Sequence, residues 1–233
     1  MKALLILALL GGAAWADDRG AIEAAVRAKT MAPKAWVVGT APGAAATVSA
    51  LTVDATDAAK GGGWFHGAMK EGATTTYITG IAAKQPDKTW AIAVEMFAPA
   101  IPDAELWKRA IPRDAGAAPP YDDVLGSAMF SIVTQGLDTT MAAAAAANGT
   151  APGETCSTAA ACAKLASVWS KLDMELLEFT QARAVVPGRL AFALGKVMLP
   201  AKKKDTIVPL TVGIVMVNVK GEWRWAVVSF AAP

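Results

Sequence analysis

The chain has 233 residues and a formal net charge of +2 at pH 7, with 54% apolar and 18% charged residues. A nearly neutral chain without clustered lysines and arginines lacks the electrostatic footprint of a nucleic-acid-binding protein. No stretch after residue 16 reaches about 18 uninterrupted apolar residues, so no membrane-spanning helix is predicted there. One histidine and two cysteines are too few for the usual tetrahedral zinc site, and no cofactor motif is recognised.

Residues 1–16, MKALLILALLGGAAWA, have the layout of a secretory signal peptide. Lys2 supplies the positive start, residues 3–10 form the apolar run, and Ala14-Trp15-Ala16 is a small-x-small cleavage site. We therefore expect a mature chain that begins at Asp17 and is secreted or periplasmic.

Residues 17–98 are predicted to form an N-terminal α+β unit. Ile22, Ala25 and Val26 share one face of a predicted helix over 18–29. After it come a short apolar segment at 35–38, a turn at 39–43, a flexible glycine loop at 61–63, and strands at 74–82 and 89–97 joined by a turn at 85–88.

A proline-rich connector over 99–120, with a short helix at 103–110, leads to a second α+β unit over 121–233. Its helices are predicted at 121–147 and 157–171, and its strands at 174–184, 189–199, 206–217 and 223–230, with the lysine run 202–204 in a hairpin loop. Helices followed by an antiparallel meander indicate an α+β fold.

Two sequence echoes favour tandem related units, with the first as a degenerate copy. GTAPG occurs at 39–43 and at 149–153, and QPDKTWAIAVEMFAP (85–99) parallels VPGRLAFALGKVMLP (186–200). Alanine-rich sequence also produces chance matches, so the alternative of no duplication stays open.

The second half, about 121–230, resembles the SnoaL-like group of the nuclear transport factor 2-like superfamily. The resemblance rests on a helix, the turn GTAPGE, another helix, and a meander ending in VPLTVGIVMVNVKGEWRWAVVSF. It implies a curved antiparallel sheet packed on helices, a cone-like (cystatin-like) roll with an internal pocket. Members include isomerases and cyclases as well as non-catalytic binding and assembly domains, so the fold does not settle function.

Three ionisable residues are candidates for catalysis. His66, in GGGWFHGAM, lies where a glycine loop could form a lid, or where two aromatic residues anchor an exposed loop. Glu178, on a predicted strand, would be a general acid or base if it faced an apolar pocket, because burial raises a carboxyl pKa. Asp138, after Gly136, is a third candidate. The alternative is surface charge on a strand for Glu178 and on a helix for Asp138.

Three aromatic residues are candidates for ligand binding: Trp223, Trp225 and Phe179. Trp223 and Trp225 are two apart on the predicted last strand and so share a face, where core packing is the alternative role. Cys156 and Cys162 are expected to form a disulfide in an oxidising compartment. Residues six apart on one helix point about 240° apart, so this bridge requires Cys156 to lie outside the helix.

The leading functional prediction is a secreted or periplasmic, non-catalytic binding or interaction protein with a small apolar pocket. It would bind a small apolar molecule or a protein partner and use neither cofactor nor metal. One alternative is a proton-transfer enzyme of the ketosteroid isomerase, dehydratase or cyclase type, with Glu178 as the base. Another is an envelope or oligomer assembly module, since folds of this kind often dimerise through their sheet.

Overall fold

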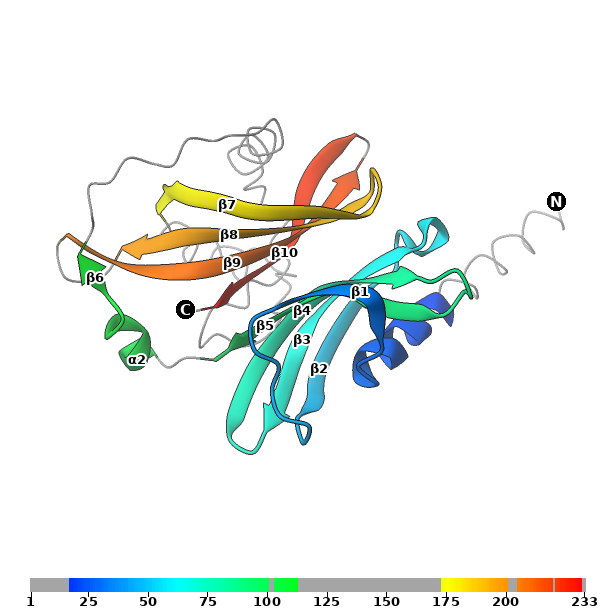
Figure 1. Cartoon of the computed structure of the whole chain (residues 1–233), viewed down its shortest axis with the longest axis horizontal. Coiled ribbons are helices and arrows are strands. Elements are labelled where there is room, and N and C mark those ends of the chain that lie inside the picture. The colour runs from blue at the N-terminus through cyan, green and yellow to red at the C-terminus, as the bar shows by residue number, and fades with distance from the viewer. Residues whose placement is uncertain (1–16, 101–102, 113–172, 201–204, 220, 232–233) are drawn as a thin grey trace, which may run out of the picture.

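The structure, a computed structural model, describes residues 17–100, 103–112, 173–200, 205–219 and 221–231 (Figure 1). Several predicted features lie outside the described residues: the signal peptide, the helices at 121–147 and 157–171, the lysine run, Asp138, Cys156 and Cys162.

The described chain begins with a helix over residues 17–27, followed by a five-stranded sheet that we call sheet A. Its strands are β1 (Met31–Val38), β2 (Thr47–Asp54), β3 (Gly62–Glu71), β4 (Thr74–Lys84) and β5 (Trp90–Pro99), with the 3-10 turn η1 (Ala58–Lys60) between β2 and β3. The strand order is β1-β5-β4-β3-β2. β1 runs parallel to β5, whereas the other pairs are antiparallel, so sheet A is mixed.

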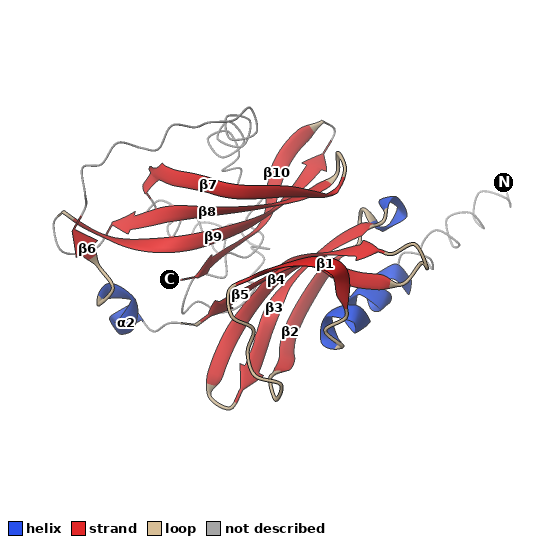
Figure 2. Cartoon of the chain, in the orientation of Figure 1, coloured by secondary structure: helices blue, strands red, loops and turns tan. Residues whose placement is uncertain are grey.

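The rest of the described chain forms a second sheet, sheet B. After α2 (Asp103–Trp107) come β6 (Ile111–Pro112), β7 (Asp173–Val186), β8 (Leu190–Pro200), β9 (Thr206–Val219) and β10 (Glu222–Ala231). The order is β10-β9-β8-β7, all antiparallel, and β6 pairs with the first residues of β9. In the described residues sheets predominate over helices (Figure 2), so the α+β prediction is confirmed only in part.

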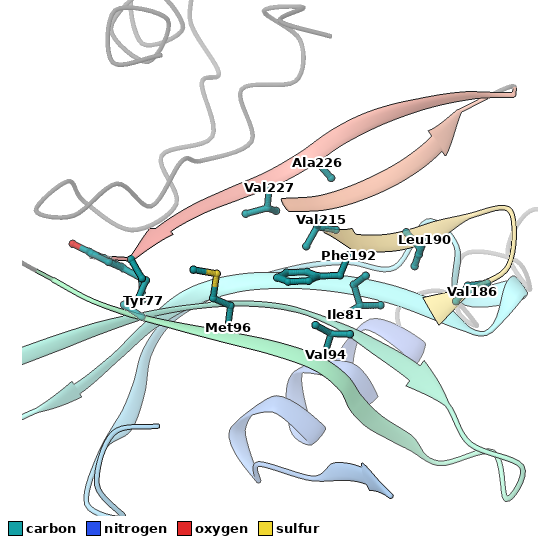
Figure 3. Packing of buried hydrophobic residues seen from close by; sticks show 13 residues of the cluster. Tyr77, Ile81, Val94, Met96, Val186, Leu190, Phe192, Val215, Ala226 and Val227 are labelled. Atoms are coloured by element: carbon teal, nitrogen blue, oxygen red, sulfur yellow. The ribbon is translucent and has the colours of Figure 1, made fainter. Parts of the chain in front are cut away.

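Sheet A lies between two partners, the N-terminal helix on one face and sheet B on the other. Ile22 and Val26 of the helix belong to one buried cluster with Phe65 of β3. The second cluster joins the sheets and includes Met96 of β5 and Phe192 of β8, which point toward one another in Figure 3. Because both of its faces are covered, the central strands β4 and β5 of sheet A are buried over most of their length.

Glycine allows the two sheets to approach closely at two points. A side chain at Gly213 of β9 would collide with Met96 and Phe192, and one at Gly62 of β3 would collide with Val186 and Leu190. Trp36 of β1 also packs edge-to-face on the Phe192 ring, with 5.4 Å between centroids. The inter-sheet layer is therefore packed like a core.

The strands predicted at 74–82, 89–97 and in the four segments from 174 to 230 are confirmed as β4, β5 and β7–β10, within a few residues at each end. The prediction of a flexible loop at 61–63 is wrong, because Gly62 and Gly63 begin β3 and are buried. β2 and β3 were not predicted. A bulge between Val48 and Ala50 interrupts the alternation of β2, and β3 has none because both its faces are covered.

The echoed segments occupy different positions in the two sheets. Residues 85–99 end in β5, the last strand of the meander β2–β5, whereas residues 186–200 hold β8, the second strand of the meander β7–β10. When the two meanders are matched strand by strand in chain order, β5 corresponds to β10, whereas the sequence echo pairs β5 with β8.

Candidate functional site

A cleft of about 400 Å³ opens between the two sheets at one end of the inter-sheet layer. Its described lining is Asp54, Thr56, Asp57, Trp64, Arg189, Val217, Asn218 and Ala226, of which the first four come from sheet A and its β2–η1 connection and the rest from sheet B. Clefts that combine an apolar wall with a few polar groups are the usual form of small-ligand sites.

The acidic side of the cleft is set by the turn that follows β2. Asp54 is the last residue of β2, and its Oδ1 accepts a hydrogen bond of 2.9 Å from the backbone N–H of Thr56. Such a bond reverses the chain directly after a strand. The turn places Asp57, the residue before η1, on the same side.

The basic side is Arg189, in the turn between β7 and β8. The backbone N–H of Arg189 donates to Val186 O at 3.0 Å and its carbonyl accepts from Asn218 N at 2.8 Å, so its main chain is fixed. Arg189 Nε lies 3.0 Å from Asp57 Oδ1, an ion pair that joins the two sheets. Nε is nevertheless buried without an aligned hydrogen bond.

Trp64 and His66 connect the cleft with the buried layer. They are two apart on β3, and their rings are stacked at 6.0 Å between centroids and 19° between planes. His66 is only 2% exposed, and its Nε2 has no hydrogen-bond partner among the described residues. Burial lowers the pKa of His66 to about 4, so the imidazole is neutral at pH 7.

A polar strip continues beyond His66. His66 is opposite Thr79 of β4 in the strand register, and the Thr79 hydroxyl is hydrogen-bonded to the Ser229 hydroxyl of β10. Both residues are fully buried. This bond links the sheets across an otherwise apolar layer.

Glu95, at the centre of β5, is another buried ionisable group among the described residues. It alternates with Val94 and Met96, which face sheet B, so its side chain points to the helix side of sheet A. Glu95 is 4% exposed, and burial raises its pKa to about 7, partly offset by the Lys29 cation. A carboxyl that titrates near neutrality can accept or release a proton, although Glu95 is not among the described residues that line the cleft.

The structure places the backbone of four sequence candidates on two strands of sheet B. Glu178 and Phe179 lie on β7 opposite Lys196 and Gly195, and Trp223 and Trp225 lie on β10 opposite Asn218 and Met216. The side chains of these four residues lie outside the described part of the structure. His66 stacks on the cleft residue Trp64 as a buried residue of β3, so the lid interpretation and the exposed-loop interpretation are both wrong.

The cleft residues and Glu95 were missed at the sequence level. One signal was available, because Glu95 is the single charge in the apolar run WAIAVEMFAP. Asp54, Asp57 and Arg189 carry no motif, since only the packing of the sheets brings them together. In the described part of the chain, no group of three or more His, Cys, Asp or Glu residues could hold a metal ion. No helix there is long and apolar enough to cross a membrane.

Comparison with known proteins gives weak structural neighbours. No known family model and no curated protein matches the chain. A cystatin-like protein from Ruminococcus gnavus ATCC 29149 is 9% identical with a TM-score of 0.22; the match covers 78% of this chain and 64% of that one. An Ntf2-like protein involved in plasmid conjugation is 6% identical with a TM-score of 0.22, covering 81% and 78%.

Proposed function

We propose that this chain is a binding protein that works outside the cytoplasm and holds a small molecule in the cleft between its sheets. The pattern of residues 1–16 supports the location, and the SnoaL-like resemblance of the second half supports a pocket-forming sheet. The observation that carries the binding role concerns two nitrogen atoms, Arg189 Nε and His66 Nε2.

Among the described residues, these are the buried side-chain polar atoms without a hydrogen bond. Arg189 lines the cleft, and His66 stacks on Trp64, which also lines it. Buried polar groups in folded proteins are almost always hydrogen-bonded, so each exception needs a physical reason. Arg189 Nε lies 3.0 Å from Asp57 Oδ1 without being aligned for a hydrogen bond. The reason that we propose is a ligand that binds the other N–H groups of the guanidinium beside the stacked Trp64–His66 pair.

Filling the mouth of the cleft tests this function. Thr56 is an exposed lining residue, so Thr56→Trp places an indole in the opening while leaving the buried layer intact. Ligand-observed NMR with a library of aromatic, amine and carboxylate fragments should detect compounds that bind the wild type and lose binding in Thr56→Trp.

Lys60→Trp is the matched control, because Lys60 is exposed on η1 and is not among the described lining residues. It should bind the same fragments as the wild type. The proposal fails when no fragment binds, or when Thr56→Trp binds every fragment as well as Lys60→Trp does.

A further inference from the structure

We infer that the ligand of the cleft is a free aromatic α-amino acid, bound as its zwitterion. Arg189 would receive the carboxylate, Asp54 the ammonium group, and Trp64 the ring. This inference rests on the proposed binding function and names the chemical class of the ligand.

The carboxylate position follows from the way Arg189 is held. A guanidinium presents five N–H donors in a rigid fork that matches a carboxylate. Asp57 lies beside Nε at 3.0 Å and holds the side chain in place, and Arg189 keeps 41% of its side chain exposed. The remaining N–H groups of the fork are therefore accessible to an anion from the cleft.

The ammonium position follows from the charge of the lining. Three described lining residues are charged: Asp54, Asp57 and Arg189. Because Asp57 is paired with Arg189, one negative charge, that of Asp54, is left over. Asp54 uses Oδ1 to hold the Thr56 turn, so its second oxygen is the acceptor for a cation. A pure anion would meet this charge without compensation, whereas a zwitterion places its ammonium group beside Asp54 and its carboxylate at the N–H groups of Arg189 that Asp57 does not occupy, which remain donors although Asp57 offsets the charge.

The ring position follows from the apolar part of the lining. Trp64 contributes an indole, and Val217 and Ala226 contribute aliphatic surface. Flat aromatic groups stack on an indole at offset geometry and gain contact energy beyond the area that they bury. A cleft of about 400 Å³ is near the lower end of ligand pockets, which suits a molecule of amino-acid size.

Four probes separate the three contacts in isothermal titration calorimetry at pH 7. L-phenylalanine carries all three groups, N-acetyl-L-phenylalanine lacks the ammonium, L-phenylalaninamide lacks the carboxylate, and L-alanine lacks the ring. We expect L-phenylalanine to bind roughly tenfold to hundredfold more tightly than the two blocked compounds, the usual effect of a hydrogen bond to a charged group. It should also bind more tightly than L-alanine, which has no ring to bury against Trp64. The two blocked compounds also represent the ends of a peptide, so tighter binding of either one would point to a peptide terminus and overturn the inference.

Two variants test the assignment of the ends. Arg189→Gln should remove binding of N-acetyl-L-phenylalanine but not that of L-phenylalaninamide, whose cation also gains from the Asp57 charge that then lacks its counter-ion. Asp54→Asn should do the converse, since an asparagine oxygen still accepts the Thr56 N–H while the charge is lost. Arg183→Gln is the control, because Arg183 is an exposed arginine of β7 bonded to Lys34 O, outside the described cleft lining.

The results distinguish this inference from the function on which it rests. Fragments that bind in a Thr56-dependent manner, with no binding of L-phenylalanine, overturn the ligand class and leave the binding role standing. Absence of any cleft-dependent binding overturns both. Equal losses in Arg189→Gln and Arg183→Gln, in variants whose thermal unfolding is unchanged, also overturn the inference.

Discussion

His66 and Glu95 lie on opposite faces of sheet A and are shifted in opposite directions by the same cause, burial. Burial lowers the pKa of His66 from 6.5 to about 4 and raises that of Glu95 from 4.5 to about 7. Each group is therefore held in its uncharged form over most of the interval between pH 4.5 and 6.5. Between pH 4.5 and 6.5 a rise in pH therefore weakens the contribution of Glu95 to the free energy of unfolding and strengthens that of His66.

The signs follow from proton binding. For Glu95 the folded state binds the proton more tightly than the unfolded state does, so its contribution is complete below pH 4.5 and is lost as pH rises toward about 7. For His66 the unfolded state binds the proton more tightly, so the contribution of His66 to stability is complete above pH 6.5 and is lost as pH drops toward about 4. Each shift corresponds to about 3 kcal/mol at most.

We therefore predict that two substitutions give opposite pH profiles. In Glu95→Gln, which keeps His66 as the one titrating member of this pair, the free energy of unfolding should rise by about 2–3 kcal/mol between pH 4.5 and 6.5. In His66→Leu it should fall by a similar amount, whereas the wild type should change little. Urea unfolding at several pH values measures this. Parallel profiles for the two variants would show that neither group is buried as described.

At the scale of the elements, the sequence predicted the strands whose ends are marked by turn residues. Pro86-Asp87 and Pro187-Gly188 bound β5 and β8, and both strands were found. β3 was missed because GGWFHGAM has neither alternation nor the branched residues that favour strands. Its glycines are required by packing against neighbours that are remote in sequence, which no local pattern reveals.

Gly67 and Gly20 should respond in opposite ways to alanine. A side chain at Gly67 of β3 would collide with the backbone of Ala50 on β2, so Gly67→Ala should destabilise the protein by about 1–3 kcal/mol. Gly20 lies in the N-terminal helix, and a Cβ added there would meet no other part of the described chain within 4 Å beyond the helix's own backbone, so Gly20→Ala should stabilise the protein by about 0.5–1 kcal/mol. Urea unfolding checks both. A stable Gly67→Ala protein would contradict the β2–β3 pairing.

At the scale of the molecule, the cleft was beyond sequence prediction because sheet-on-sheet packing creates it. Asp57 is more than a hundred residues from Arg189 and Ala226 in the sequence and meets them only when sheet B lies on sheet A. The sequence resemblance directed attention to the inside of the second unit, whereas the described cleft lies between the sheets.

Because the two sheets share one core, we predict that their backbone amides lose protection against hydrogen exchange together. Phe192 of β8 is fully buried between them, so Phe192→Ala should cost about 3–5 kcal/mol. Hydrogen exchange measured by mass spectrometry should then accelerate in β4 and β5 as well as in β8 and β9. Gln181→Ala, at an exposed position of β7, is the control and should change neither sheet. Acceleration confined to β7–β10 would show that the sheets unfold separately.

The contact between Met96 and Gly213 has a chemical consequence. The thioether sulfur is fully buried against the facing strand, so peroxide reaches it only when the sheets separate. A sulfoxide is polar and bulkier than the thioether, and it would not fit back against Gly213. In an oxidising environment, oxidation of Met96 while the sheets are separated would therefore prevent them from packing together again. The fraction of Met96 found as sulfoxide would then report how often the two sheets separate.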